Sequence, residues 1–182
     1  DLGAAKLMEA KRTPFKDLSF WLGLVIILVS IFLMIGAYLR WFQLRFLIGP
    51  FSLGHWLGWI GTLFIMFFTP VYYVLKRRYP KRLKMLITIH VFGNLFAFML
   101  VSIHFAQQVG RPAQFYPDLG TGLALYVVML ILMATGFVHR FQLLRHVGRF
   151  SVPHRNRFLH ISITLSFYLI VFFHILRNVG VI

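Results

Sequence analysis

The order of hydrophobic and polar positions divides the chain into five long apolar runs, separated by short polar or basic segments. Each run approaches the roughly 20 apolar residues that an α-helix needs to cross a bilayer. Strands of a membrane barrel would instead alternate apolar and polar residues over about ten positions. The sequence therefore predicts an all-α membrane bundle in which residues 1–182 form a single domain. The predicted membrane helices cover residues 18–39, 53–75, 85–106, 119–138 and 158–176.

Composition supports this class of protein. The chain has 182 residues, of which 59% are hydrophobic and only 13% charged, a balance far from that of soluble domains. It contains no cysteine, which excludes disulfides, thiolate metal sites and the covalent attachment of a c-type haem. The first apolar run follows a basic arm and is too long for the apolar region of a signal peptide, so we expect an uncleaved signal anchor.

The formal net charge of +15 raises the question of nucleic-acid binding, but the positions of the cations argue against it. The N-terminal arm, the second connection and the fourth connection hold four, six and five Lys or Arg residues, whereas the remaining segments hold four together. This bias predicts a cytoplasmic N-terminus and an outer C-terminus. The basic residues then orient the chain in the membrane and contact anionic lipids. We expect a multi-pass protein of a prokaryotic plasma membrane.

Two of the apolar runs begin and end with histidine. The segments HVFGNLFAFMLVSIH and HISITLSFYLIVFFH place His90 and His104, and His160 and His174, at the same interval of fourteen residues. This interval is nearly four helical turns, so the two imidazoles of each helix share one face and lie roughly 21 Å apart along the axis. Both helices follow basic connections and run in the same direction. His90 should therefore lie level with His160, and His104 with His174.

Histidines within membrane helices usually face the bundle interior and mark function. One imidazole from each helix at two matched levels fits two six-coordinate haem irons. Zinc or copper would need further close ligands, and these segments contain no Cys, Asp or Glu. The prediction is two haem b groups, one held by His90 and His160 and one by His104 and His174. Taken singly, any of the four could instead hydrogen-bond a neighbouring helix.

Other residues could contact the haems. Gly122 and Gly136, again fourteen apart, would let a porphyrin approach the fourth membrane helix, although small residues also serve ordinary helix packing. Haem propionates need cations or hydrogen-bond donors. The side chains proposed below for this task could instead set the membrane topology or contact lipid headgroups. The histidine among them could instead form an interfacial hydrogen bond or contact a quinone headgroup. The candidates are Lys84, Arg155 and Arg157 on the inner side and His55, Arg111 and Arg177 on the outer side.

With these residues the chain resembles two families of transmembrane b-type cytochromes. In the ferric reductase and NADPH oxidase family, the third and fifth membrane helices carry paired histidines at about this spacing, matched here by His90 with His104 and His160 with His174. The cytochrome b subunit of the respiratory bc complex is similar, with paired histidines on two helices of a four-helix haem bundle. The resemblance implies a haem-binding core made of the last four helices. A Gly-rich dinucleotide fingerprint and a Pro-Glu-Trp-Tyr quinol-site segment are absent, so neither family's electron-donor site carries over.

We therefore expect an electron-transfer subunit that carries electrons across the membrane between an inner and an outer bis-histidine haem. Its partners would be other subunits of a membrane redox complex, or quinol. The more basic inner side should raise the potential of the inner haem. Three alternatives remain open: a quinol or ferric reductase acting through its own haems, a histidine-based transporter or proton channel without haem, and a purely structural subunit.

Overall fold

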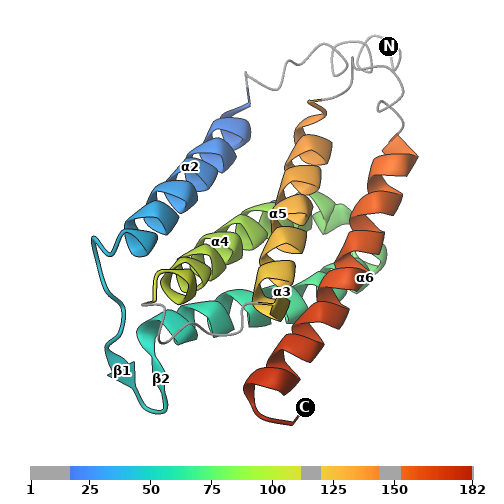
Figure 1. Ribbon diagram of the computed structural model, residues 1–182. Coiled ribbons are helices and arrows are strands. Elements are labelled where there is room, and N and C mark those ends of the chain that lie inside the picture. Colours follow the sequence, from blue (N-terminus) through green and yellow to red (C-terminus); the bar gives the residue numbers. More distant parts are fainter. Residues whose placement is uncertain (1–16, 112–119, 144–152, 182) are drawn as a thin grey trace, which may run out of the picture.

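The computed structural model describes residues 17–111, 120–143 and 153–181, and the side chains of residues 153–156 lie outside this description. Five long helices, one short 3₁₀ turn and one small β-hairpin make up the described chain (Figure 1). In chain order they are α2 (Leu18–Tyr38), β1 (Leu47–Ile48), β2 (Phe51–Ser52), α3 (Leu53–Arg78), η2 (Pro80–Arg82), α4 (Leu83–Val109), α5 (Gly120–Phe141) and α6 (Pro153–Asn178).

All five long helices are sufficiently long and apolar to cross a membrane, which confirms the predicted number of spans in the described chain. Four of them extend beyond the predicted apolar runs: α3 continues to Arg78, α4 covers residues 83–109, α5 continues to Phe141, and α6 begins at Pro153. Hydropathy locates only the part of a helix that lies in hydrocarbon. Lys and Arg are good helix formers, and Pro is well tolerated at a first helical position, so the helices continue through the polar segments.

The hairpin between α2 and α3 was not predicted. Leu47 pairs with Ser52 and Ile48 with Phe51 in an antiparallel register. The loop between them begins at Gly49, whose φ of 61° lies in the left-handed region that glycine adopts without strain. The Trp56 indole of α3 donates a hydrogen bond to the Ile48 carbonyl at 2.9 Å, which ties the hairpin to the start of that helix.

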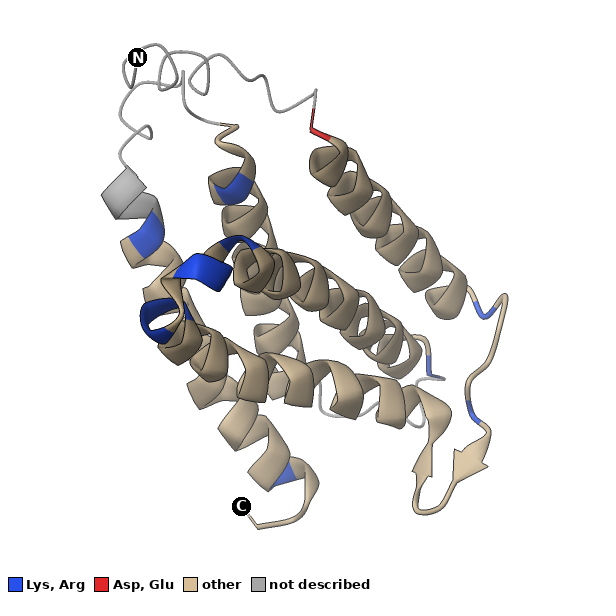
Figure 2. Cartoon of the chain, turned by 180° about the vertical axis from the view of Figure 1, so that it is seen from behind, with Lys and Arg blue, Asp and Glu red and all other residues tan. Residues whose placement is uncertain are grey.

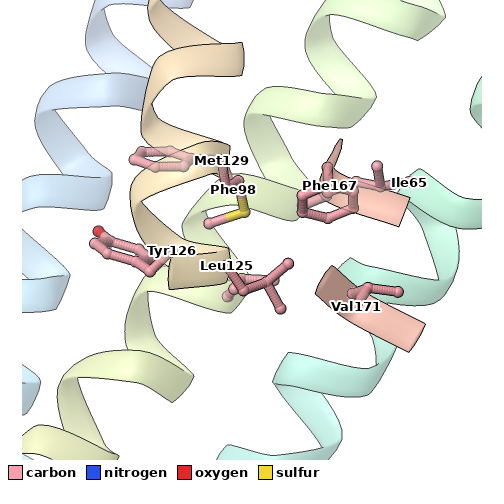
Figure 3. Packing of buried hydrophobic residues seen from close by; sticks show 9 residues of the cluster. Ile65, Phe98, Leu125, Tyr126, Met129, Phe167 and Val171 are labelled. Carbon is pink, nitrogen blue, oxygen red and sulfur yellow. The ribbon is translucent and has the colours of Figure 1, made fainter. Parts of the chain in front are cut away.

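The helices pack in two groups. Helix α4 packs extensively against α3 and also against α2, which was expected at the periphery, while α5 packs mainly against α6. Side chains from α3, α4, α5 and α6 meet in a buried cluster at the middle of the bundle (Figure 3). Most other large apolar side chains are exposed on the outer surface, as expected for helices whose solvent is lipid. The cluster contains Ile65, Ala97, Phe98, Val101, Leu125, Tyr126, Met129, Phe167 and Val171.

The cations divide between the two ends of the bundle (Figure 2). We call one end the basic end and the other, which carries β1 and β2, the hairpin end. Asp17, at the start of α2, is the single acidic residue in the described part of the chain. The hairpin end holds Arg40, Arg45, Arg111 and Arg177, and the basic end holds Lys76, Arg77, Arg78, Lys81, Arg82, Lys84, Arg140 and Arg157.

Candidate functional site

The four membrane histidines lie in two couples, one near each end of the bundle. At the basic end, His160 of α6 lies within electrostatic range of His90 of α4. At the hairpin end, His174 lies within electrostatic range of His104. The sequence interval placed the same residues level with each other, so the fold brings the predicted partners together.

The ring of His104 rests against α3. Its Nδ1 lies 3.0 Å from the Gly54 carbonyl oxygen and donates a hydrogen bond to it. A Cβ atom at Gly58 would lie only 2.7 Å from Cγ of His104, so glycine is needed there for the ring to occupy this position. With the proton on Nδ1, the lone pair of the neutral ring is on Nε2, which makes Nε2 the coordinating atom.

The ring of His90 is also supported by α3. Tyr72 stacks on it with ring centroids 4.3 Å apart and an interplanar angle of 13°. The Asn94 amide lies one turn along α4, with Nδ2 3.1 Å from Nδ1 of His90, and its Oδ1 is buried without a hydrogen-bond partner in the described chain. Rotating the amide by 180° would let Oδ1 accept the Nδ1 proton. In either orientation the amide engages Nδ1.

Side chains of α5 support the two histidine rings of α6, as α3 supports the histidine rings of α4. His160 Nδ1 lies 3.0 Å from Thr135 Oγ1. That hydroxyl already donates to the Ile131 carbonyl at 2.8 Å, so it accepts from Nδ1. His174 Nδ1 lies 3.0 Å from Thr121 Oγ1, and the Asn178 amide makes longer contacts, 3.3 and 3.4 Å, with both ring nitrogens.

Two predicted glycines of α5 follow these threonines and touch the same rings. A Cβ at Gly136 would lie 3.2 Å from Cε1 of His160, and one at Gly122 would lie 3.4 Å from Cε1 of His174. Both glycines lie at the histidine levels beside the imidazole rings. The predicted close approach of a porphyrin to them stays a prediction.

The interval of fourteen residues therefore recurs in all four helices around the site. In α3, Gly58 supports the His104 ring and Tyr72 supports the His90 ring. In α5, Thr-Gly pairs begin at Thr121 and Thr135. Sequence reasoning found the histidines and the α5 glycines but missed Gly58, Tyr72 and the two threonines. Their common interval was the available signal, because residues fourteen apart face the same neighbouring helix at the same two depths.

Packed side chains separate the two levels. Phe167 and Val171, between the two histidines of α6, are 1% and 0% exposed. They belong to the same buried cluster as Ala97 and Val101, which lie between the histidines of α4. A packed apolar layer therefore separates the two histidine couples.

At the basic end, the sequence predicted Lys84, Arg155 and Arg157 as propionate contacts. Arg157 lies within electrostatic range of Tyr72, the residue stacked on His90. Lys84 is exposed at the start of α4. The Arg155 side chain lies outside the described residues. Lys76, which the prediction omitted, lies within range of His90, with its Nζ 4.9 Å from the centroid of the Tyr72 ring.

At the hairpin end, His55 belongs to the surroundings of His104. The centroids of the two rings are 5.3 Å apart, in an edge-to-face arrangement. His55 Nδ1 lies 2.7 Å from Ser52 Oγ, and Arg111 lies within electrostatic range of both rings. Arg177 is exposed at the end of α6.

Within residues 17–111, 120–143 and 157–181, no three His, Cys, Asp or Glu side chains form a group that could hold a metal ion. Comparison with protein-family models, curated proteins and solved structures found no match. The five apolar helices define a multi-pass helical membrane protein, and the histidine couples are its candidate functional site.

Proposed function

We propose that the chain is a dihaem b-type cytochrome that carries electrons across a membrane. One haem b would be held by His90 and His160 near the basic end, and the other by His104 and His174 near the hairpin end. The observation that carries the proposal is that all four histidines engage Nδ1 with a backbone or side-chain group. Metal-binding histidines almost always use their second nitrogen in this way, which fixes the ring and increases its basicity.

The haems would supply reversible one-electron chemistry when bound. The chain's own residues perform the remaining tasks. Thr135 and the Gly54 carbonyl hold the Nδ1 protons of His160 and His104, so both rings offer Nε2. Phe167 and Val171 exclude water from the region between the two levels. Arg157 and Lys76 at the basic end, and Arg111 at the hairpin end, are suited to binding propionates.

The basic end would face the cytoplasm, because Lys and Arg are enriched on the cytoplasmic side of membrane proteins. The electron path would then run between the cytoplasmic and outer faces of a prokaryotic plasma membrane. Other subunits of a redox complex, or quinol, would supply or remove the electrons. The charge asymmetry in Figure 2 supports this orientation.

The deciding experiment is a reduced-minus-oxidised absorption spectrum of the purified chain, with a measured haem-to-protein ratio. We expect two haems per chain and one in each of the variants His90→Ala and His174→Ala. The control is His139→Ala, which removes an exposed histidine near the basic end and should retain both haems. A colourless, folded wild-type protein would refute the proposal and favour a haem-free proton pathway through the histidines.

A further inference from the structure

A cavity of about 440 Å³ opens at the hairpin end, between the hairpin, the end of α2, the start of α3 and the end of α4. Arg40, Arg45 and Arg111 line it together with His55 and Gln107. Its volume lies within the range of small-molecule sites. The cavity lies beside the hairpin-end couple, because the His55 ring contacts the His104 ring.

Within the described residues, the cavity carries positive charge with no acidic side chain beside it. Three of the four cations described at the hairpin end line this one cavity, and none of the lining residues is acidic. Arg40 directs Nε and Nη2 to the Gly110 carbonyl oxygen at 3.0 and 2.7 Å, which is a neutral acceptor. Cations are few at this end of the bundle, so the clustering of three around one cavity calls for a local cause.

The arginine side chains that line the cavity bring several N–H donors and no acceptor. The long helix α3 begins here. Its N-cap residue Ser52 makes no side-chain capping bond, and the amides of Leu53 and Gly54 donate to the Phe46 and Leu44 carbonyls. A helix N-terminus adds positive potential to the guanidinium charges. A ligand suited to this lining is negatively charged and rich in acceptor oxygens.

We propose that this cavity binds a small oxyanion or carboxylate from the aqueous phase at the hairpin end. Guanidinium groups match such ligands because their paired N–H donors meet two oxygens at once. Binding itself depends only on the cavity. Its consequence rests on the proposed function: an anion beside the His104 couple stabilises ferric iron and lowers the potential of the hairpin-end haem.

The test uses the full chain in phosphatidylcholine nanodiscs, titrated with inorganic phosphate and with malonate in a calorimeter. We expect saturable binding that weakens as sodium chloride is raised, because salt screens exposed charges. The double variant Arg45→Gln/Arg111→Gln should lose at least about tenfold in affinity, the scale of one charged hydrogen bond. The charge-retaining variant Arg45→Lys/Arg111→Lys should keep more of it. The control Arg177→Gln removes an arginine that does not line the cavity and should bind as the wild type.

Three results would overturn the proposal. The first is the absence of saturable anion binding to the folded wild-type chain. The second is equal binding by the double glutamine variant with an unchanged helical circular dichroism spectrum. The third is a calorimetric signal that the arginine substitutions change only when phosphatidylglycerol is added, which would identify the occupant as a lipid headgroup. Anion binding by a chain that lacks haem would refute the proposed function alone. In the haem-loaded chain, malonate should shift the potential of the hairpin-end haem downward.

Discussion

At the scale of single residues, the histidine sites depend on small groups that support the rings. Gly58 leaves room for His104, and Thr135 fixes the proton of His160. The histidines could be found from sequence because two imidazoles per membrane helix are rare and costly. Gly58 and Thr135 could not, since glycine and threonine are common in membrane helices for packing reasons alone. Only the neighbouring helix shows which ring each one meets.

The first prediction compares two glycine substitutions. Gly58→Ala would place a Cβ 2.7 Å from Cγ of His104, a distance that forces the ring or the helix to move. We expect destabilisation of about 1–3 kcal/mol, the usual cost of overpacking, and loss of haem at the hairpin end. Gly122→Ala is the matched control, because its Cβ would make an ordinary 3.4 Å contact with His174. Thermal unfolding and haem-to-protein ratios measure both effects, and equal behaviour of the two variants would contradict the account.

The second prediction concerns the proton on His160. Thr135→Val keeps the side-chain shape but removes the oxygen that accepts from Nδ1. Loss of such a partner typically reduces metal affinity by about 10–100-fold, so we expect the basic-end haem to dissociate more readily. Thr135→Ser should restore binding. The control is Thr88→Val, whose exposed hydroxyl donates only to the Lys84 carbonyl in the described chain. Haem-transfer kinetics to apomyoglobin measure the difference, and equally fast loss from both valine variants would exclude this role for Thr135.

At the scale of elements, the apolar runs predicted the five membrane helices, because burying backbone in lipid requires helices of about that length. The hairpin gave no comparable signal. Its strands contain two residues each, and its apolar side chains are mostly exposed instead of alternating between two environments. The residues that hold it in place, Trp56 and the backbone of Leu53 and Gly54, belong to the start of α3. Such contacts depend on tertiary packing and not on periodicity.

The third prediction tests the hairpin turn. Gly49 has a φ of 61°, and no described residue lies near its missing Cβ, so Gly49→Ala adds backbone strain without a clash there and should cost about 1–2 kcal/mol. Asn tolerates this region better than Ala, so Gly49→Asn should be milder. Hydrogen exchange at the amides of Leu53 and Gly54, which bond to the Phe46 and Leu44 carbonyls, reports the loosening. Faster exchange in the Asn variant than in the Ala variant would argue against strain as the cause.

At the scale of the whole molecule, the histidines occupy two repeated depths, and the cations are distributed unequally between the two ends of the bundle. The fourteen-residue interval fixes two levels in each of four helices, and the packed layer around Phe167 divides them. The two levels differ in their surroundings, because Lys76, Arg140 and Arg157 gather near the basic-end couple. Sequence predicted the levels and the charge bias. It could not predict which cations come close, since Lys76 lies at the end of a helix whose rotation is set by packing.

The last prediction rests on the proposed function and concerns the potentials of the two proposed haems. Positive charge near a haem favours the reduced iron, which carries one positive charge less, so the haem at His90 and His160 should have the higher potential. His174→Ala should leave only this centre, and His160→Ala only the lower one at the hairpin end. Lys76→Gln should lower the potential of the basic-end haem, because it removes a cation within range of His90, and leave the other centre unchanged. Redox titration of the single-haem variants assigns each potential, and a lower value at the basic end would show that burial or ligand orientation outweighs the charge asymmetry.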